Sequence, residues 1–273
     1  MPGKNRGSIG KFPIFVAMRF RLTLLFLAIS CAIFGQKFRF NSSIGASHFS
    51  WYENQATLDL AAEISFQNPE KNHRTFVSLK TMGNVMSSAI DRTTYSFIEP
   101  PMNNGNQPLD PSEALNATYR GGEAEVGLQW NTSPKLRKMR WIPSLSIYSK
   151  SIGRKISSSR AEYIEEEKYS LHGISAGIGL YIPGKTTVFI QAKIFDPLYR
   201  EVTLYGRYIG VPYQSLISEN NLNYKAKIDF NRGKFGFGFN IEILNLGEVD
   251  NPKSKSILAS QAIIPSTLFT YFF

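Results

Sequence analysis

The feature that most constrains this chain is an alternation of apolar and polar residues that returns in nearly every segment after residue 36. Between residues 56 and 66 the even positions are apolar, whereas the odd positions are mainly polar or charged. Residues 222–230 and 235–243 repeat the pattern. A period of two is typical of strands whose two faces meet different surroundings. We find no long apolar run at helical spacing after residue 36, so the sequence predicts an all-β fold.

Ten segments carry this signal, and the connections between them alternate in length. The expected strands lie near 37–50, 55–67, 74–84, 117–131, 140–153, 168–182, 186–199, 221–231, 234–246 and 258–273. Compact turns fall at 68–73, 132–139, 183–185 and 232–233, and longer loops at 85–116, 154–167, 200–220 and 247–257, with 51–54 as a short exception. This layout predicts an antiparallel up-and-down transmembrane β-barrel of about ten strands, within a range of eight to twelve. A soluble secreted β-sandwich is the alternative fold.

Two of the compact turns also predict a strand register. If Arg232-Gly233 forms a two-residue hairpin loop, Phe230 opposes Phe235. A three-residue loop at 183–185 would oppose Leu180 to Val188. In both hairpins apolar residues then meet apolar residues on one face.

The composition of the two faces separates a barrel from a sandwich. Glycines such as Gly236 and Gly238 share the polar face with charged residues, which suits a crowded lumen better than a solvated surface. Aromatic residues gather near the expected strand ends, as in the interfacial girdles of membrane barrels. We therefore expect the apolar faces to contact lipid and the polar faces to line the lumen.

Charge and cysteine content exclude several other classes. The 273 residues hold 31 Lys+Arg and 21 Asp+Glu, a net charge of +10. Five of the basic residues precede position 36, so the rest of the chain has only a modest excess of five, and we expect no nucleic-acid partner. A single cysteine excludes a disulfide scaffold and a cysteine-rich zinc site.

The first 35 residues have the pattern of an export signal. Two arginines follow Met18, an apolar run covers residues 22–34, and Gly35 follows. A basic stretch, a short apolar run and a small residue describe a secretory signal peptide, and the run is too short to span a membrane as a helix. We predict a signal peptide at 1–35, with Met18 as a candidate start, and a barrel domain at 36–273. A retained anchor and lipidation at Cys31 are the alternatives.

The C-terminus ends in alternating aromatic residues, namely Phe269, Tyr271 and Phe273. Together with the export signal and the strand meander, this ending resembles that of small outer-membrane β-barrel proteins of Gram-negative bacteria. The resemblance implies a location in the cell outer membrane, contact with outer-membrane lipids and lipopolysaccharide, and a C-terminal insertion signal for the barrel-insertion machinery. It identifies no subfamily. Pro265 departs from the pattern, because proline interrupts a strand ladder unless it lies at a bulge or a strand start.

The polar faces collect charges of both signs. A ten-stranded barrel is close to the size that side chains fill, so we expect these charges to pair across the lumen and largely plug it. The predicted lumen charges are Arg39, Asp59, Glu63, Lys80, Glu123, Glu125, Lys193, Lys225, Lys227, Asp229 and Glu242. A narrow channel for small solutes is the alternative.

Two loop segments could bind a partner. The loop at 85–116 is longer than simple closure needs, which indicates either a binding segment for a protein or glycan or plain disorder. The acidic run that contains Glu162, Glu165, Glu166 and Glu167 could hold Ca²⁺ or bridge to lipopolysaccharide through Ca²⁺, but we favour the simpler interpretation of a solvated acidic loop.

The three histidines offer little support for catalysis. By strand parity His48 should face lipid, and His73 falls in a tight turn. His172 lies near Gly173, where the apolar parity slips and indicates a bulge. We identify no catalytic, cofactor-binding or metal site. The sequence thus favours a structural, adhesive or secretion-associated barrel, followed by a narrow channel and then by an outer-membrane lipid-modifying enzyme or protease.

Overall fold

The computed structural model describes residues 37–51, 54–67, 72–84, 86–90, 114–132, 139–158, 165–206, 213–217, 221–247 and 261–273. The predicted signal peptide at 1–35 therefore lies outside the described residues. Ten long strands make up the fold. They are β1 (Lys37–Ser50), β2 (Asn54–Gln67), β3 (His73–Asn84), β5 (Leu115–Trp130), β6 (Arg140–Ser158), β7 (Glu165–Ile182), β8 (Thr187–Gly206), β10 (Asn223–Arg232), β11 (Phe235–Asn245) and β12 (Gln261–Phe272). Two short strands, β4 (Ser88–Ala89) and β9 (Tyr213–Leu216), pair with β5 and β8.

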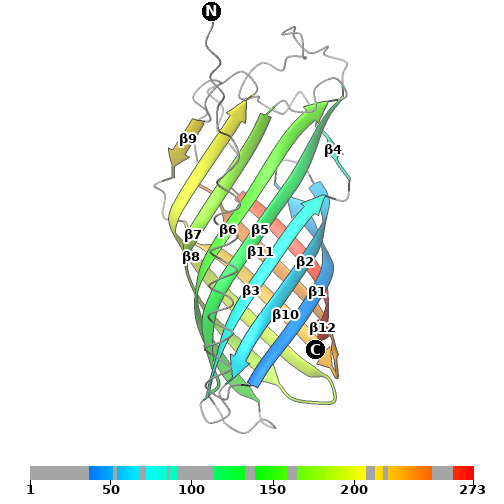
Figure 1. The fold of residues 1–273 in the computed structure, drawn as a ribbon, viewed down its shortest axis with the longest axis vertical. Coiled ribbons are helices and arrows are strands. Elements are labelled where there is room, and N and C mark those ends of the chain that lie inside the picture. Colours follow the sequence, from blue (N-terminus) through cyan, green and yellow to red (C-terminus); the bar gives the residue numbers. More distant parts are fainter. Residues whose placement is uncertain are drawn as a thin grey trace, which may run out of the picture.

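The ten long strands close into an antiparallel barrel (Figure 1). Strand β1 pairs with both β2 and β12, and β10 pairs with both β8 and β11, so every long strand has two neighbours. Closure removes the unpaired edges that an open sheet or sandwich leaves. The ten-stranded barrel is therefore confirmed, and the β-sandwich is excluded. No described helix has the length and apolar character needed to cross a membrane.

The barrel is taller on one side than on the other. Strands β5 to β8 have 16, 19, 18 and 20 residues, whereas about 9–11 tilted residues span a bilayer. Figure 1 shows these green and yellow strands reaching past the blue and cyan ones, at the end opposite the C-terminus. The predicted loop at 154–167 is correspondingly too long, because β6 continues to Ser158 and β7 already begins at Glu165.

Both predicted hairpin registers are wrong by two residues, although the faces are right. Phe230 opposes Phe237 and Arg232 opposes Phe235, so the loop is Gly233-Lys234, with Gly233 at a φ of 60°. In the second hairpin Leu180 opposes Ile190. A shift of two residues leaves every side chain on the same face, which is why the apolar pattern alone could not detect it.

The seam between the first and last strands contains two local irregularities. A Cβ atom at Gly45 would overlap the backbone carbonyl oxygen of Thr267, so the two strands approach closely only because position 45 is glycine. Pairing of β1 with β12 is recorded at Ser47–Ser266 and again at Ser50–Ile263, but not between them, where Pro265 lies. Pro265 still pairs with Ile241 of β11, so the proline interrupts one ladder without ending the strand.

Candidate functional site

The exterior of the barrel carries an apolar belt. Phe237, Phe239 and Ile241 on β11 are 42%, 47% and 46% exposed, although phenylalanine and isoleucine are normally buried in soluble proteins. The same outward positions on other strands are also large and apolar. They include Phe38, Ile44, Leu58, Leu60, Leu128, Trp130, Trp141, Leu145, Ile147, Ile174, Ile178, Ile190, Ile194, Phe235 and Phe269. A closed barrel with an apolar exterior band and a polar interior is compatible with lipid and not with water. The protein has the fold of an outer-membrane β-barrel.

Similarities to known proteins concern the fold alone. No family model and no curated protein matches the chain. Among solved structures it is similar to a major outer membrane protein from Thermus thermophilus, with 10% identity over 86% of this chain and 99% of that one and a TM-score of 0.39. The translocator domain of autotransporter NalP from Neisseria meningitidis gives 10% identity, 96% and 98% coverage and a TM-score of 0.41. Ail from Yersinia pestis gives 9% identity, 86% and 97% coverage and a TM-score of 0.33.

All eleven predicted lumen charges occupy inward-facing positions. Nine of them line one cavity in the half of the barrel nearest the tight turns. The other two are buried: Asp59 lies 2.7 Å from the Nζ atom of Lys80, and Glu242 lies 2.5 Å from that of Lys150. The structure thus brings the predicted charges together inside the barrel.

A network of ion pairs crosses the middle of the lumen. Lys225 on β10 lies 3.2 Å from Glu123 on β5, and Glu123 lies 3.1 Å from Lys150 on β6. Lys150 continues the network to Glu242 on β11, so the chain of charges joins strands that are several positions apart around the ring. Lys193 and Glu125 form a further pair beside it. We call these six residues the ionic layer; the opposite charges compensate one another where water is scarce.

Sequence reasoning missed five inward-facing basic residues, namely Arg74, Arg140, Lys150, Arg154 and Arg200. The signal was present for Lys150, because it shares its strand parity with Ser144 and Ser146, both buried inside the barrel. Extending the alternation of residues 140–153 to this position would have found it. The central cation of the ionic layer was therefore predictable but overlooked.

Below the ionic layer the lumen holds a cavity of about 420 Å³, which we call the vestibule. Residues near the turn ends of the strands line it, including Gln67, Asn131 and Asn231. The vestibule therefore lies at the end of the barrel that carries the tight turns, which is the periplasmic end in outer-membrane barrels.

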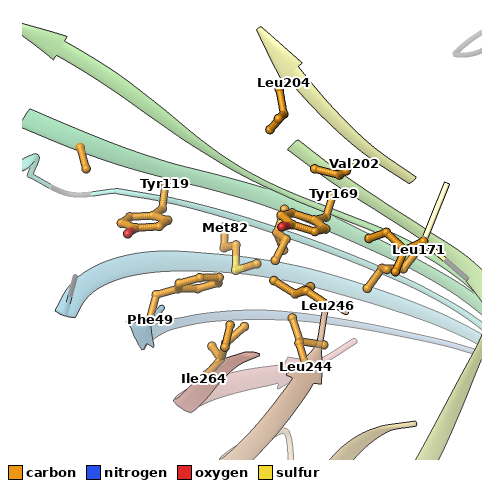
Figure 2. Packing of buried hydrophobic residues seen from close by; sticks show 14 of the residues in the cluster. Phe49, Met82, Tyr119, Tyr169, Leu171, Val202, Leu204, Leu244, Leu246 and Ile264 are labelled. Atoms are coloured by element: carbon orange, nitrogen blue, oxygen red, sulfur yellow. The ribbon is translucent and has the colours of Figure 1, made fainter. Parts of the chain in front are cut away.

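Above the ionic layer most buried side chains are apolar, which the sequence analysis did not anticipate, although the charged side chains of Arg154, Glu165, Glu167 and Arg200 are buried at the same level. Figure 2 shows side chains from opposite walls converging there. Phe49 stacks on Tyr119 with ring centroids 5.2 Å apart, and Trp51 lies 5.5 Å from Tyr169. We call this cluster the apolar plug. Its members are Phe49, Met82, Ile90, Leu115, Ala117, Tyr119, Tyr148, Ile152, Ile156, Tyr169, Leu171, Phe195, Val202, Leu204, Ile217, Leu244, Leu246, Ala262 and Ile264.

The polarity of the two faces therefore reverses along the tall strands. On β7 the inward residues change from buried Tyr169 and Leu171 to Ser175, while the outward residues change from Lys168 to exposed Ile174. The apolar face is inside above the reversal and outside below it. Above the reversal the barrel wall resembles a soluble protein, and below it the wall resembles a membrane protein.

This reversal corrects the interpretation of the parity slip near Gly173. The slip does not come from a bulge in β7, whose side chains alternate without interruption. The register does shift there, but on the partner strand: His172 opposes Tyr199 and Gly173 opposes Pro197, so the extra residue is Leu198 of β8. The predicted bulge therefore lies at the predicted height of the barrel, beside Gly173, but it belongs to β8 and not to β7.

The histidines lie on the outer wall of the barrel. His48 is exposed on the outward face of β1, as its parity predicted. His172 lies on the outward face with its ring 5.7 Å from that of Tyr199, whose hydroxyl donates a hydrogen bond of 2.5 Å to Glu201. His73 begins β3 at the end of the tight turns. The three rings thus lie on separate parts of the wall and do not form a common site.

The acidic run is divided rather than gathered in a loop. Glu165 and Glu167 are buried inside β7, whereas Glu166 faces outward and pairs with Arg120. Glu162 lies outside the described residues. Because adjacent strand residues point to opposite faces, the run cannot form one carboxylate cluster. Among the described residues no group of three His, Cys, Asp or Glu could hold a metal ion.

The three residues of the predicted insertion signal lie on the outer side of the wall, Phe269 and Tyr271 in β12 and Phe273 directly after it. Phe269 packs beside Phe235 at 5.9 Å, and Tyr271 lies 4.7 Å from Phe273. The backbone N–H of Phe273 donates to the carbonyl oxygen of Phe40, so the last residue is still bonded to β1. The aromatic ending therefore forms part of the closed wall.

Proposed function

We propose that the protein is a closed-lumen anchor that presents its long loops at the cell surface, in a structural, adhesive or secretion-associated role. The observation that carries this proposal is the double closure of the lumen. The ionic layer crosses it near the middle, and the apolar plug fills it above. A barrel that is filled twice along its axis is better suited to display than to passage.

The extra height of β5 to β8 supports the same role. Above the belt the outward residues of β5, β6 and β7 are mostly small or polar, such as Ser149, Ser151, Ser170 and Arg120. A wall of this kind can stand in water or among lipid headgroups and sugars, where it raises the connecting segments away from the hydrocarbon. The proposed partners are lipopolysaccharide around the wall and a protein or glycan at loop 85–116, of which residues 91–113 lie outside the described part of the chain.

Planar-bilayer recording of the refolded barrel tests the closure. We expect no steady, ion-selective conductance steps, because neither the ionic layer nor the apolar plug leaves a continuous aqueous path. A 16-stranded porin incorporated in the same bilayers provides the positive control. Regular steps from the wild-type protein would contradict the closed lumen and support a narrow channel.

Surface proteolysis tests the display. A short protease recognition site inserted between residues 104 and 105 should be cut on intact cells, whereas the same site inserted after Gly184 should be cut only after the outer membrane is permeabilised. Both insertions lie between strands, so neither disturbs the ring. Cutting at Gly184 on intact cells would contradict the proposed orientation, because it would place the tight turns at the cell surface.

A further inference from the structure

The vestibule is a concave site that the display function does not use. Its volume of about 420 Å³ lies within the range of about 300–1,000 Å³ that is usual for small-molecule sites. The ionic layer forms its floor, so the vestibule is a blind pocket that opens toward the tight turns.

The lining of the vestibule has an excess of positive charge. Seven basic and four acidic side chains line it. Five of the basic side chains form ion pairs, as Lys227 does with Asp229 at 2.9 Å. The other two are Arg39 on β1 and Arg140 on β6, and neither has an ion pair with any of the residues that the structure describes. The uncompensated charge thus comes from two separate strands that face the same cavity.

Arg140 supplies the most clearly unsatisfied charged group of this pocket. The residue is only 9% exposed, and its guanidinium carbon lies 4.2 Å from the centroid of the Tyr181 ring, which holds the planar group against one wall. Its Nε atom is buried without a hydrogen-bond partner among the described residues. A buried charged group with an unsatisfied donor is costly, and the cost is relieved when an acceptor binds.

The chemistry of the acceptor follows from the donor. A guanidinium presents a planar fork of N–H groups that matches the two oxygens of a carboxylate or phosphate. Arg39 adds a second positive charge from the facing wall. We propose that the vestibule binds a small soluble anion with a carboxylate or phosphate group, which enters from the periplasmic side and is held by Arg140 and Arg39.

Calorimetric titration of the folded, detergent-solubilised protein tests this site, with inorganic phosphate and succinate as separate probes at low ionic strength. We expect saturable binding of at least one probe. Arg140→Gln and Arg39→Gln should each weaken binding by about tenfold, the effect of losing one charge-assisted hydrogen bond. Added sodium chloride should weaken wild-type binding as well, because it screens the charges.

Lys185→Gln is the matched control, since Lys185 is exposed in the β7–β8 turn at the same end of the barrel and does not line the vestibule. It should bind as the wild type does. Heat-modifiable gel migration verifies that each variant is folded, and Arg39→Gln keeps the test valid if Arg140→Gln does not fold. The proposal is overturned if the wild type binds neither probe saturably, or if the Arg39→Gln/Arg140→Gln double variant binds as tightly as the wild type.

Discussion

The lower and upper halves of this barrel are built from the same strands and have opposite polarity. On β6, Leu145 and Ile147 face outward below, whereas Ser149 and Ser151 face outward above. Inside, the ionic layer below gives way to the apolar plug above. Alternation thus reveals that a strand has two different faces. The residue at which the apolar side chains change from the outward to the inward face marks the edge of the apolar belt.

The two halves are stabilised in different ways because their surroundings differ. In the lower half lipid covers the exterior, and the polar interior depends on ion pairs and hydrogen bonds, such as that from Asn240 to Ser266. In the upper half the exterior is mostly small or polar, and the interior is stabilised mainly by burial of apolar surface, beside a few buried charges such as Arg154 and Glu167. Substitutions with the same chemistry should therefore have different effects in the two halves.

The largest difference is expected for phenylalanine truncation. Phe49→Ala should lower the free energy of unfolding by about 3–5 kcal/mol, because it leaves a cavity in the packed plug. Phe237→Ala should lower it by only about 1–2 kcal/mol, because lipid chains can fill the space left on the outer wall. Urea unfolding in lipid vesicles, followed by tryptophan fluorescence, measures both. Equal losses would contradict the assignment of Phe49 to a solid interior.

The next largest difference in the free energy of unfolding is expected for a charged substitution on the outer wall. Phe239→Arg places a cation in the middle of the apolar belt and should cost about 2–4 kcal/mol. Ser170→Arg makes an outward substitution of the same charge above the belt and should change stability by less than about 0.5 kcal/mol. The same unfolding assay compares the pair. A large loss at position 170 would place the hydrocarbon boundary higher on the wall.

The smallest effect is expected at glycines near opposite ends of the barrel. Gly233→Ala should cost about 1 kcal/mol, because the tight turn requires a φ of 60° at this position. Gly83→Ala, near the loop end of β3, meets no atom within 4 Å and has no positive φ, so it should be neutral or slightly stabilising. If both changes are neutral, the conformation of the Gly233 turn does not limit stability.

The sequence predicted the barrel, the number of strands and the side of the wall on which Glu123 or Phe239 lies, because side-chain parity is a local property. It did not predict the hairpin registers, since opposing Phe230 to Phe235 or to Phe237 satisfies the same pattern. It also missed the apolar plug. In the sequence, Tyr169 and Leu171 lie on the opposite strand face from Ile174. Parity alone, however, cannot show which of the two faces points into the barrel.

Similarly, the vestibule could not be derived from the sequence. Arg39 was assigned to the lumen, but Arg140 stands at a strand start where the parity gives a weak signal. That the two arginines face one cavity depends on the closure of the ring, which brings β1 and β6 to facing walls. Such a site is a product of tertiary structure.

The solid interior of the upper barrel has a consequence for how the exposed surface can change over time. Most of its side chains, among them Phe49, Tyr169 and Leu204, come from strands rather than from the segments that connect them. The packing of these side chains thus fixes the positions of the upper strand ends, whatever the sequences of the connecting segments. The sequences of the connecting segments can therefore change without altering the strands that form the wall of the barrel.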